Sequence, residues 1–212
     1  MVTTARTEPS PQSTTEPALE AIGICHRYGD HEVLRDVTLV VQPGERVAIT
    51  GENGAGKSTL MRICARLLVP QAGTLRVEGR VGYCPQVPGL HELLTADEHL
   101  ALFSPALGLA REEGVRRGRE LLAEFGFPAD QRGQARHLSG GSQQKLNLAL
   151  ALLGGAGVLL LDEPYQGFDH GSYLNFWDHV ARWGEQGIAV IVVTHMLQDL
   201  QMVDRVVDLT PR

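Results

Sequence analysis

The sequence predicts an α/β fold with a mostly parallel central sheet, an antiparallel β-subdomain and a small helical subdomain. Two kinds of strand and one charged helical segment lead to this prediction. Four short runs are apolar throughout, which is typical of strands buried on both faces of a parallel sheet. Three other runs alternate only partly and have Gly or Pro at their ends, as antiparallel strands do.

The elements follow from these patterns in chain order. The antiparallel strands are expected in the segments LEAIGIC, DVTLVVQ and TLRVEG, and the parallel strands in RVAIT, VGYC, VLLLD and IAVIVVT. Helices are expected at 57–68 and 174–183, between the parallel strands. The segment around 92–138 contains the charged stretch REEGVRRGRELLAEFG and is predicted to be the helical subdomain.

Length and composition fit one domain. The first 17 of the 212 residues are rich in Thr, Pro and Ser, so we expect a disordered tail at 1–17 and a domain over 18–212. The three cysteines are odd in number and lack CxxC spacing, which favours reduced cytosolic thiols over disulfides or zinc. The longest uncharged stretch, 148–161, is shorter than the roughly 18 residues that span a bilayer.

The charge balance argues against nucleic acid as a partner. The net charge is −6, so no bulk basic field is available to attract a polyanion. Arg116, Arg117 and Arg119 are close together, but a solvated helix face explains them. The N-terminus also lacks the basic and apolar regions of a signal peptide.

A glycine-rich loop, GENGAGKST, follows the apolar run at 47–50 and precedes an amphipathic helix. It fits G-x-x-x-x-G-K-[ST], in which backbone N–H groups surround phosphate oxygens at a helix N-terminus. We expect Lys57 to reach the β- and γ-phosphates, Ser58 to ligate Mg²⁺ and Thr59 to contact the α-phosphate region. The sequence therefore predicts a P-loop NTPase core. Its candidate binding residues are Gly51, Glu52, Asn53, Gly54, Ala55, Gly56, Lys57, Ser58 and Thr59.

Two adjacent acids end the strand VLLLD. Asp162 suits the coordination shell of Mg²⁺ together with Ser58. Glu163 is expected to orient or deprotonate the water that attacks the γ-phosphate. The same residues would also form an ordinary acidic turn before Pro164. Two acids side by side nevertheless favour hydrolysis over phosphoryl transfer to a second substrate.

A polar residue also follows the strand IAVIVVT. Open α/β sheets bind ligands at the carboxyl ends of their strands, so we expect His195 to face the same crevice as Asp162 and Glu163. The other histidines lack such a position, and we assign them to the surface or to packing.

A second glycine-rich turn, HLSGGSQQKLNLALAL, taken alone would be an ordinary Ser-capped helix start. In context, LSGGSQQ resembles the signature motif of the ATP-binding subunits of ABC transporters, and other elements of that family appear in its order over 18–209. Gln86 in VGYCPQ resembles the Q-loop glutamine, Asp169 the D-loop aspartate, His195 the switch histidine and Tyr28 the aromatic residue that stacks on adenine.

This resemblance implies ATP and Mg²⁺ as ligands, with Glu163, His195 and Gln86 as catalytic residues. It places Gln86 in the Mg²⁺ shell beside Ser58 and Asp162, and it counts Asp169 among the nucleotide-binding residues.

The resemblance also implies a head-to-tail pair of subunits. Each nucleotide then lies between the 51–59 loop of one subunit and Ser139, Gly140 and Gly141 of the other. The hydroxyl and amides of this turn can donate to a γ-phosphate, and the helix expected at 142–153 directs its positive end there. The implied partners are a second copy, forming a homodimer, and a separate integral membrane permease. The permease would hold the chain peripherally at the cytoplasmic face of the cell membrane.

The sequence departs from the family pattern at a few positions. Ser142 replaces the usual Gln after the signature glycines, which we expect to have a small effect. In YQGFD, Gln166 and Phe168 stand where small residues and Leu are common, and they are expected to tune communication between the two sites. Every catalytic position is filled, so an active enzyme is expected.

The segment GLHELLTADEHLALFSPALGL resembles subunits that partner ABC-2-type export permeases, so an exporter is expected. An importer subunit is the main alternative. Soluble ABC ATPases of translation or DNA repair are disfavoured, because the chain has one cassette and only 53 positions from Gln86 to Ser139. A P-loop kinase is disfavoured because no second substrate site is visible.

Overall fold

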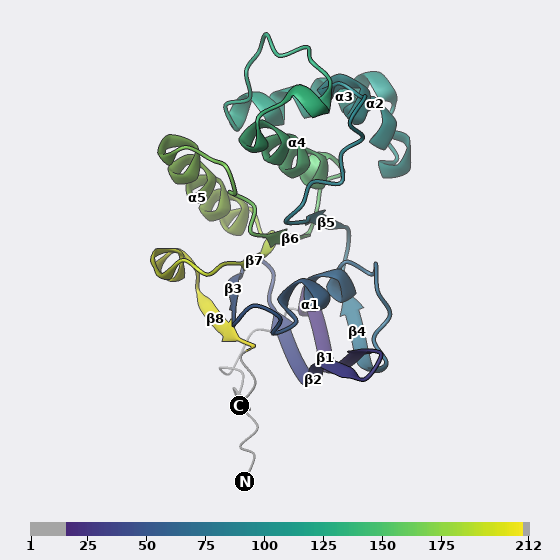
Figure 1. Cartoon of the computed structure of the whole chain (residues 1–212), viewed down its shortest axis with the longest axis vertical. Helices are drawn as coiled ribbons and strands as arrows, with labels where there is room; N and C mark the ends of the chain where they lie inside the picture. The colour runs from purple at the N-terminus through teal and green to yellow at the C-terminus, as the bar shows by residue number, and fades with distance from the viewer. Residues whose placement is uncertain (1–15, 210–212) are drawn as a thin grey trace.

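The structure is a computed structural model that describes residues 16–209, and its strands form two sheets (Figure 1). The parallel sheet has the order β5-β6-β7-β3-β8, and the antiparallel sheet has the order β2-β1-β4. The predicted fold class is confirmed. The predicted tail lies outside the described residues, apart from positions 16 and 17. The strands are β1 (Leu19–Tyr28), β2 (His31–Val41), β3 (Arg46–Thr50), β4 (Ala72–Val77), β5 (Val81–Cys84), β6 (Val158–Asp162), β7 (Ala189–Val193) and β8 (Arg205–Asp208).

One strand was not predicted from the sequence. β8 has only four residues, half of them exposed, so it lacks the continuous apolar run that marks the other parallel strands. It pairs with β3 at the edge of the sheet, where Asp204 accepts hydrogen bonds from the backbone N and side chain of Arg46. The hydrogen bond from Arg46 holds the pKa of Asp204 below its usual range.

Five α-helices and three short 3₁₀ segments complete the described chain. Figure 1 shows α2, α3 and α4 gathered at one end of the molecule, beyond the strands of the parallel sheet. No helix among residues 16–209 is long and apolar enough to cross a membrane. The helical elements are α1 (Lys57–Cys64), α2 (Ala96–Phe103), η1 (Pro105–Leu107), α3 (Arg111–Glu124), η2 (Ala135–His137), α4 (Gly140–Leu153), α5 (His170–Glu185) and η3 (Leu197–Gln201).

Four helix boundaries differ from the expected ones, and one of them is the end of α5, which lies at Glu185 rather than 183. α1 ends at Cys64 rather than 68, because Arg66 adopts a left-handed backbone with φ 59°. α5 begins at His170 rather than 174, because the Asp169 carboxylate caps it. α4 begins at Gly140 rather than 142, with Ser139 as its N-cap. The prediction missed these ends because caps lie outside the apolar pattern.

The central strands of the parallel sheet are buried on both faces, which explains their runs of apolar residues. In β6, Leu159 and Leu161 belong to a core shared with the helices α4 and α5, whereas Val158 and Leu160 belong to a second core. That second core also contains residues of α1 and of the antiparallel sheet. Since successive side chains of a strand point to opposite faces, both sets must be apolar.

The arginine cluster lies on a solvated helix face, as expected. Arg116 pairs with Glu113 and Glu120 on the exposed face of α3, and Arg119 pairs with Asp97 of α2. The three cysteines are all free, two of them buried, and burial raises the pKa of Cys64 to about 12.

We predict that Gly82→Ala destabilises the fold by about 1–3 kcal/mol. A Cβ at Gly82 would lie 2.2 Å from the backbone oxygen of Ala151, so β5 and α4 would have to separate. Gly89→Ala is the matched control, because a Cβ there meets nothing within 4 Å. Urea unfolding should show a lower midpoint for Gly82→Ala alone. Equal midpoints for the two variants would contradict the close packing of this strand and helix.

Candidate functional site

The glycine loop joins the end of β3 to the start of α1, and one of its glycines is required by packing. Gly56 has φ 93°, and a Cβ there would lie 2.6 Å from Cδ2 of Leu34 and 2.7 Å from the backbone oxygen of Val33. Both neighbours belong to β2, so the loop rests directly on the β1–β2 hairpin. Only glycine allows this approach together with a positive φ.

The start of α1 offers donors to an anion. Gly56 is the N-cap and makes no side-chain cap, and the first turn contains no acidic residue. The Lys57 Nζ donates to the backbone oxygens of Gly51 at 2.7 Å and Glu52 at 2.9 Å, so its charge lies over the loop. Unsatisfied helix N–H groups, the helix dipole and one ammonium together fit a phosphate chain.

Asp162 ends β6 and is 2% exposed. Burial raises the pKa of this carboxyl, and a hydrogen bond with the Ser58 side chain opposes the rise. The two side chains therefore meet although more than a hundred residues separate them in the chain. A carboxylate beside a hydroxyl is a set of oxygen ligands of the kind that Mg²⁺ takes, so these residues fit that ion.

Glu163 is the meeting point of three loops. Its Oε2 accepts hydrogen bonds from Nε2 of Gln86 at 3.0 Å and Nε2 of Gln166 at 2.7 Å. Its Oε1 lies 3.4 Å from Nδ1 of His195. The structure therefore brings together Gln86 after β5, Glu163 after β6 and His195 after β7, as expected for strand ends of one parallel sheet.

The backbone of Glu163 is strained. It has φ 47°, in the left-handed region that residues other than glycine rarely adopt. Such a conformation costs about 1–3 kcal/mol and persists where the surroundings determine it strongly, often at functional sites. Here the Glu163 N–H donates to the backbone oxygen of Val193 at 3.2 Å, which links the turn after β6 to the end of β7.

The second glycine turn lies at the N-terminus of α4. The Ser139 Oγ accepts from Ser142 N at 3.2 Å and donates to Ser142 Oγ at 3.0 Å. Ser139 and Gly140 are exposed, whereas Gly141 is buried against Gly167, whose oxygen would lie 2.4 Å from a Cβ. The turn is thus fixed on the segment that follows Glu163, and its open side faces outward.

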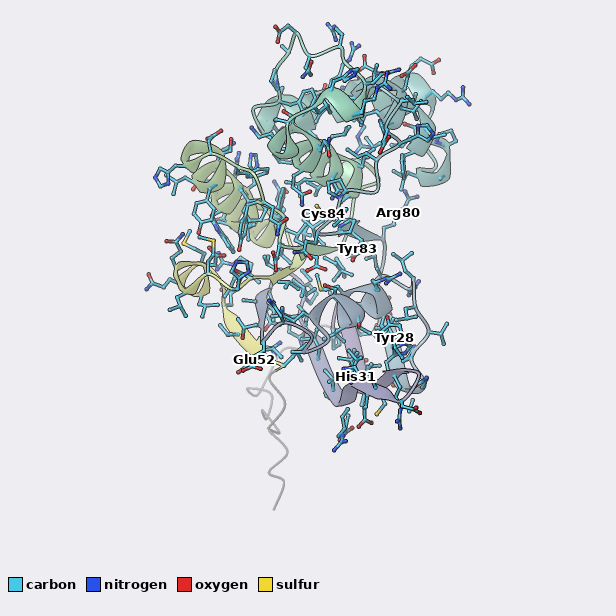
Figure 2. The ribbon with its side chains drawn as sticks, in the orientation of Figure 1. Tyr28, His31, Glu52, Arg80, Tyr83 and Cys84 are labelled. Atoms are coloured by element: carbon cyan, nitrogen blue, oxygen red, sulfur yellow. The ribbon has the colours of Figure 1, made fainter. Side chains whose placement is uncertain are left out.

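Asp169 and Tyr28 have simpler surroundings. Asp169 caps α5 by accepting from Ser172 N at 2.8 Å and Ser172 Oγ at 3.0 Å, and these bonds keep the pKa of Asp169 low. Tyr28 is half-exposed at the end of β1 and packs edge-on against His26, with 4.9 Å between ring centroids. Tyr28 pairs with His31 in the β1–β2 hairpin, on which Gly56 packs. Glu52 lies in the glycine loop that contains Gly56 (Figure 2).

Sequence reasoning missed a buried set of polar side chains near Glu163 and His195. Tyr165 lies two residues after Glu163, Thr194 immediately precedes His195, and both contact the buried Asp199. The available signal was a residue with a hydroxyl group close to each of the two catalytic candidates, Tyr165 near Glu163 and Thr194 next to His195. It was weak, because Thr194 reads as the last residue of an apolar strand.

Known proteins resemble this chain over most of its length. The family model described as ABC transporter matches residues 34–166. The human phospholipid-transporting ATPase ABCA7 is 35% identical over 82% of this chain and 9% of its own length. A probable metal transport system ATP-binding protein of Thermotoga maritima is 36% identical over 84% of this chain and 74% of its own. The macrolide export ATP-binding/permease protein MacB of Neisseria gonorrhoeae is 33% identical, over 82% and 30%.

Solved structures agree with the fold. An ATP binding subunit of an ABC transporter has a TM-score of 0.82 and 32% identity, covering 90% of this chain and 85% of its own. The dimeric structure of MJ0796, a bacterial ABC transporter cassette, has a TM-score of 0.83 and 25% identity, covering 91% and 94%. The chain thus spans about a tenth of human ABCA7 but nearly all of the MJ0796 cassette.

Proposed function

Because the chain belongs to the ABC transporter family and is an ATPase domain of that family, we propose that two copies hydrolyse ATP as a head-to-tail pair. The hydrolysis drives export of a substrate by a separate membrane permease, with the chain bound peripherally at the cytoplasmic face.

The observation that carries the proposal is the convergence on Glu163. One oxygen of its carboxylate accepts hydrogen bonds from Gln86 and Gln166, and the other oxygen faces His195. The adjacent Asp162 reaches Ser58, at the start of the helix that follows the phosphate loop. A single short segment therefore connects a proton acceptor to a triphosphate site, which is the arrangement that hydrolysis needs.

Each group has a chemical task in this proposal. The N–H groups at the start of α1 and Lys57 bind the phosphates. Mg²⁺, held by Ser58, Asp162 and Gln86, would neutralise charge on the β- and γ-phosphate oxygens. Glu163 orients the attacking water and accepts its proton, while His195 and Gln86 keep the Glu163 carboxylate in place.

The second copy completes the site. Ser139 and Gly140 are exposed at the positive end of α4, where they can donate to a γ-phosphate held by another molecule. ADP lacks that phosphate, so the pair loosens after hydrolysis. The dimeric relative MJ0796 supports this assembly. Asp169 joins the interface from the start of α5.

Export is favoured by the segment at 89–109, which resembles partners of ABC-2-type permeases, and by the export protein MacB among the relatives. The Thermotoga relative, described as part of a metal transport system, keeps import as the second candidate.

We predict that Tyr28→Ala weakens ATP binding about three- to tenfold, because stacking on the base is worth about 1 kcal/mol. Tyr28→Phe keeps the ring and should bind normally. Titration calorimetry with ATP and with inorganic triphosphate separates the two contributions, since only ATP has a base to stack. Equal ATP affinity for Tyr28→Ala and the wild type would remove the stacking role.

The proposed partner can be tested by affinity purification from detergent-solubilised membranes. A multi-span membrane protein that co-purifies, and that stimulates ATP hydrolysis when the two are mixed, is the expected result. Ribosomal or DNA-bound material in its place would overturn the transport proposal and favour a soluble ABC ATPase. Direction follows from reconstitution in liposomes: with ATP outside, accumulation of substrate in the lumen indicates export.

A further inference from the structure

A fully buried carboxylate, that of Asp199, lies four residues after His195 in the chain and accepts a hydrogen bond from Tyr165, two residues after Glu163. The Asp199 Oδ2 accepts hydrogen bonds from the hydroxyls of Tyr165 and Thr194, and its Oδ1 accepts one from the hydroxyl of Tyr173. The hydroxyl oxygens of Tyr165 and Thr194 also lie 2.6 Å from each other. We name Tyr165, Tyr173, Thr194 and Asp199 the Asp199 cluster. Asp199, Thr194 and Tyr165 are buried, and Tyr173 is half-buried.

The hydroxyls are what make this buried carboxylate tolerable. Among the described residues Asp199 forms no ion pair with Lys, Arg or His. Burial raises the pKa of both Tyr165 and Tyr173, so these phenols stay protonated as donors. A buried charge without donors is strongly unfavourable, so loss of any one hydroxyl disturbs the whole cluster.

The cluster ties together three segments that carry site residues. Tyr165 belongs to the turn after β6, two residues beyond Glu163, and Thr194 lies between the end of β7 and His195. Tyr173 lies in the first turns of α5. The Met196 N–H also donates to Thr194 Oγ1 at 3.0 Å, so the backbone is held on both sides of His195.

Glu163 and His195 need such support. The His195 side chain is 65% exposed, and within residues 16–209 its one ion-pair contact is the 3.4 Å approach to Glu163. Packing therefore does not fix the imidazole. The Glu163 backbone is strained and must be held by its neighbours. The positions of both side chains thus depend on the adjacent buried residues.

We propose that Asp199 is a positioning residue for ATP hydrolysis. Through the hydroxyls of Tyr165, Thr194 and Tyr173, it holds the loop of Glu163 and the loop of His195 at the distance that hydrolysis requires. This inference rests on the proposed role of Glu163 and His195. It adds to that role the buried groups that set their separation.

The sharpest test is a pair of substitutions at Thr194. Thr194→Val keeps the shape of the side chain but removes the hydroxyl, whereas Thr194→Ser keeps the hydroxyl. We expect Thr194→Val to lower kcat for ATP hydrolysis about 10- to 100-fold with little change in ATP affinity, because small misplacements of catalytic groups have effects of this size. Thr194→Ser should recover most of the loss. Equal rates for Thr194→Val and the wild type would overturn the proposal.

A second test compares two carboxylates. Asp199→Asn should lower kcat as Thr194→Val does. The control Asp204→Asn weakens the hydrogen bonds that Arg46 donates at the sheet edge, which involve no member of the Asp199 cluster, and should change stability without changing kcat. Tyr173→Phe removes only a half-buried hydroxyl and replaces Asp199→Asn if that variant does not fold. Parallel losses of kcat in the Asp199 and Asp204 variants would contradict a positioning role.

Combination with His195→Ala separates positioning from general loss of structure. If Asp199 acts through His195 and Glu163, Asp199→Asn should reduce kcat much less in the His195→Ala background than in the wild type. Fully independent effects would contradict the inference.

Failure of the proposed function would give a different result. Glu163→Gln would then hydrolyse ATP at the wild-type rate, whatever the rates of the Asp199 variants.

Discussion

Glu163→Gln should lower kcat for ATP hydrolysis at least about 100-fold while ATP still binds. The amide has the shape of the carboxylate, and its oxygen can still accept from Gln86 and Gln166, which now bond to Oε2 at 3.0 and 2.7 Å. What the amide lacks is the ability to accept a proton from water. The variant should therefore keep the site intact and accumulate an ATP-bound dimer.

Two measurements check this result. Phosphate release gives the rate, and size-exclusion chromatography with ATP and Mg²⁺ gives the fraction of dimer. Glu112→Gln is the control, because Glu112 is an exposed acid on α3 outside the site. Wild-type turnover in Glu163→Gln would remove its assigned role. A parallel loss of ATP binding would instead make Glu163 a binding residue.

Ser139→Arg should abolish hydrolysis without weakening ATP binding to the 51–59 loop of the same molecule. The serine is exposed at the N-cap of α4, so an arginine there projects outward into the space that a second copy would occupy. The lost cap destabilises the helix by about 1 kcal/mol, which Ser139→Ala reproduces without the bulk. A comparison of the two variants therefore separates the cap from the interface. Joint loss of binding and turnover in Ser139→Arg would contradict a shared site.

Mixing two inactive variants tests the head-to-tail arrangement directly. In a mixed pair of Glu163→Gln and Ser139→Arg, one site carries both defects and the other carries neither. Random pairing therefore predicts recovery of up to about a quarter of wild-type activity, if the two sites act independently. Sites contained within single molecules would show no recovery when mixed dimers are demonstrated by crosslinking.

The fold class could be predicted from the sequence because the burial of strands and helices leaves local or periodic patterns of apolar residues. β7 is apolar at every position and β6 at every position before its last residue, Asp162, since both faces of the central strands of a parallel sheet are buried. β8 was not predicted, because alternate residues of this edge strand are exposed and it therefore lacks an apolar run. It is also held by the ion pair between Arg46 and Asp204, which are far apart in the chain. Helix ends such as the one at Asp169 were also not predicted, because a cap is formed by single hydrogen bonds and leaves no repeating pattern in the sequence.

Some residues of the candidate site could likewise be predicted from their own sequence pattern, and others could not. The phosphate loop at 51–59 is one continuous segment whose residue types carry their own chemistry, so the sequence alone points to it. Strand ends likewise pointed to Asp162, Glu163 and His195. The resemblance to a known family, and not spacing, supplied Gln86, Tyr28 and the second glycine turn.

The sequence by itself determined the fold class, the phosphate loop and the acids at the strand end, because each is encoded in consecutive residues. Only the tertiary structure decided that Gln166 bonds to Glu163, that Gly141 must be small against Gly167, and that Asp199 gathers three hydroxyls. These contacts join side chains from separate loops. Their energies depend on distance and burial, which the order of residues does not contain.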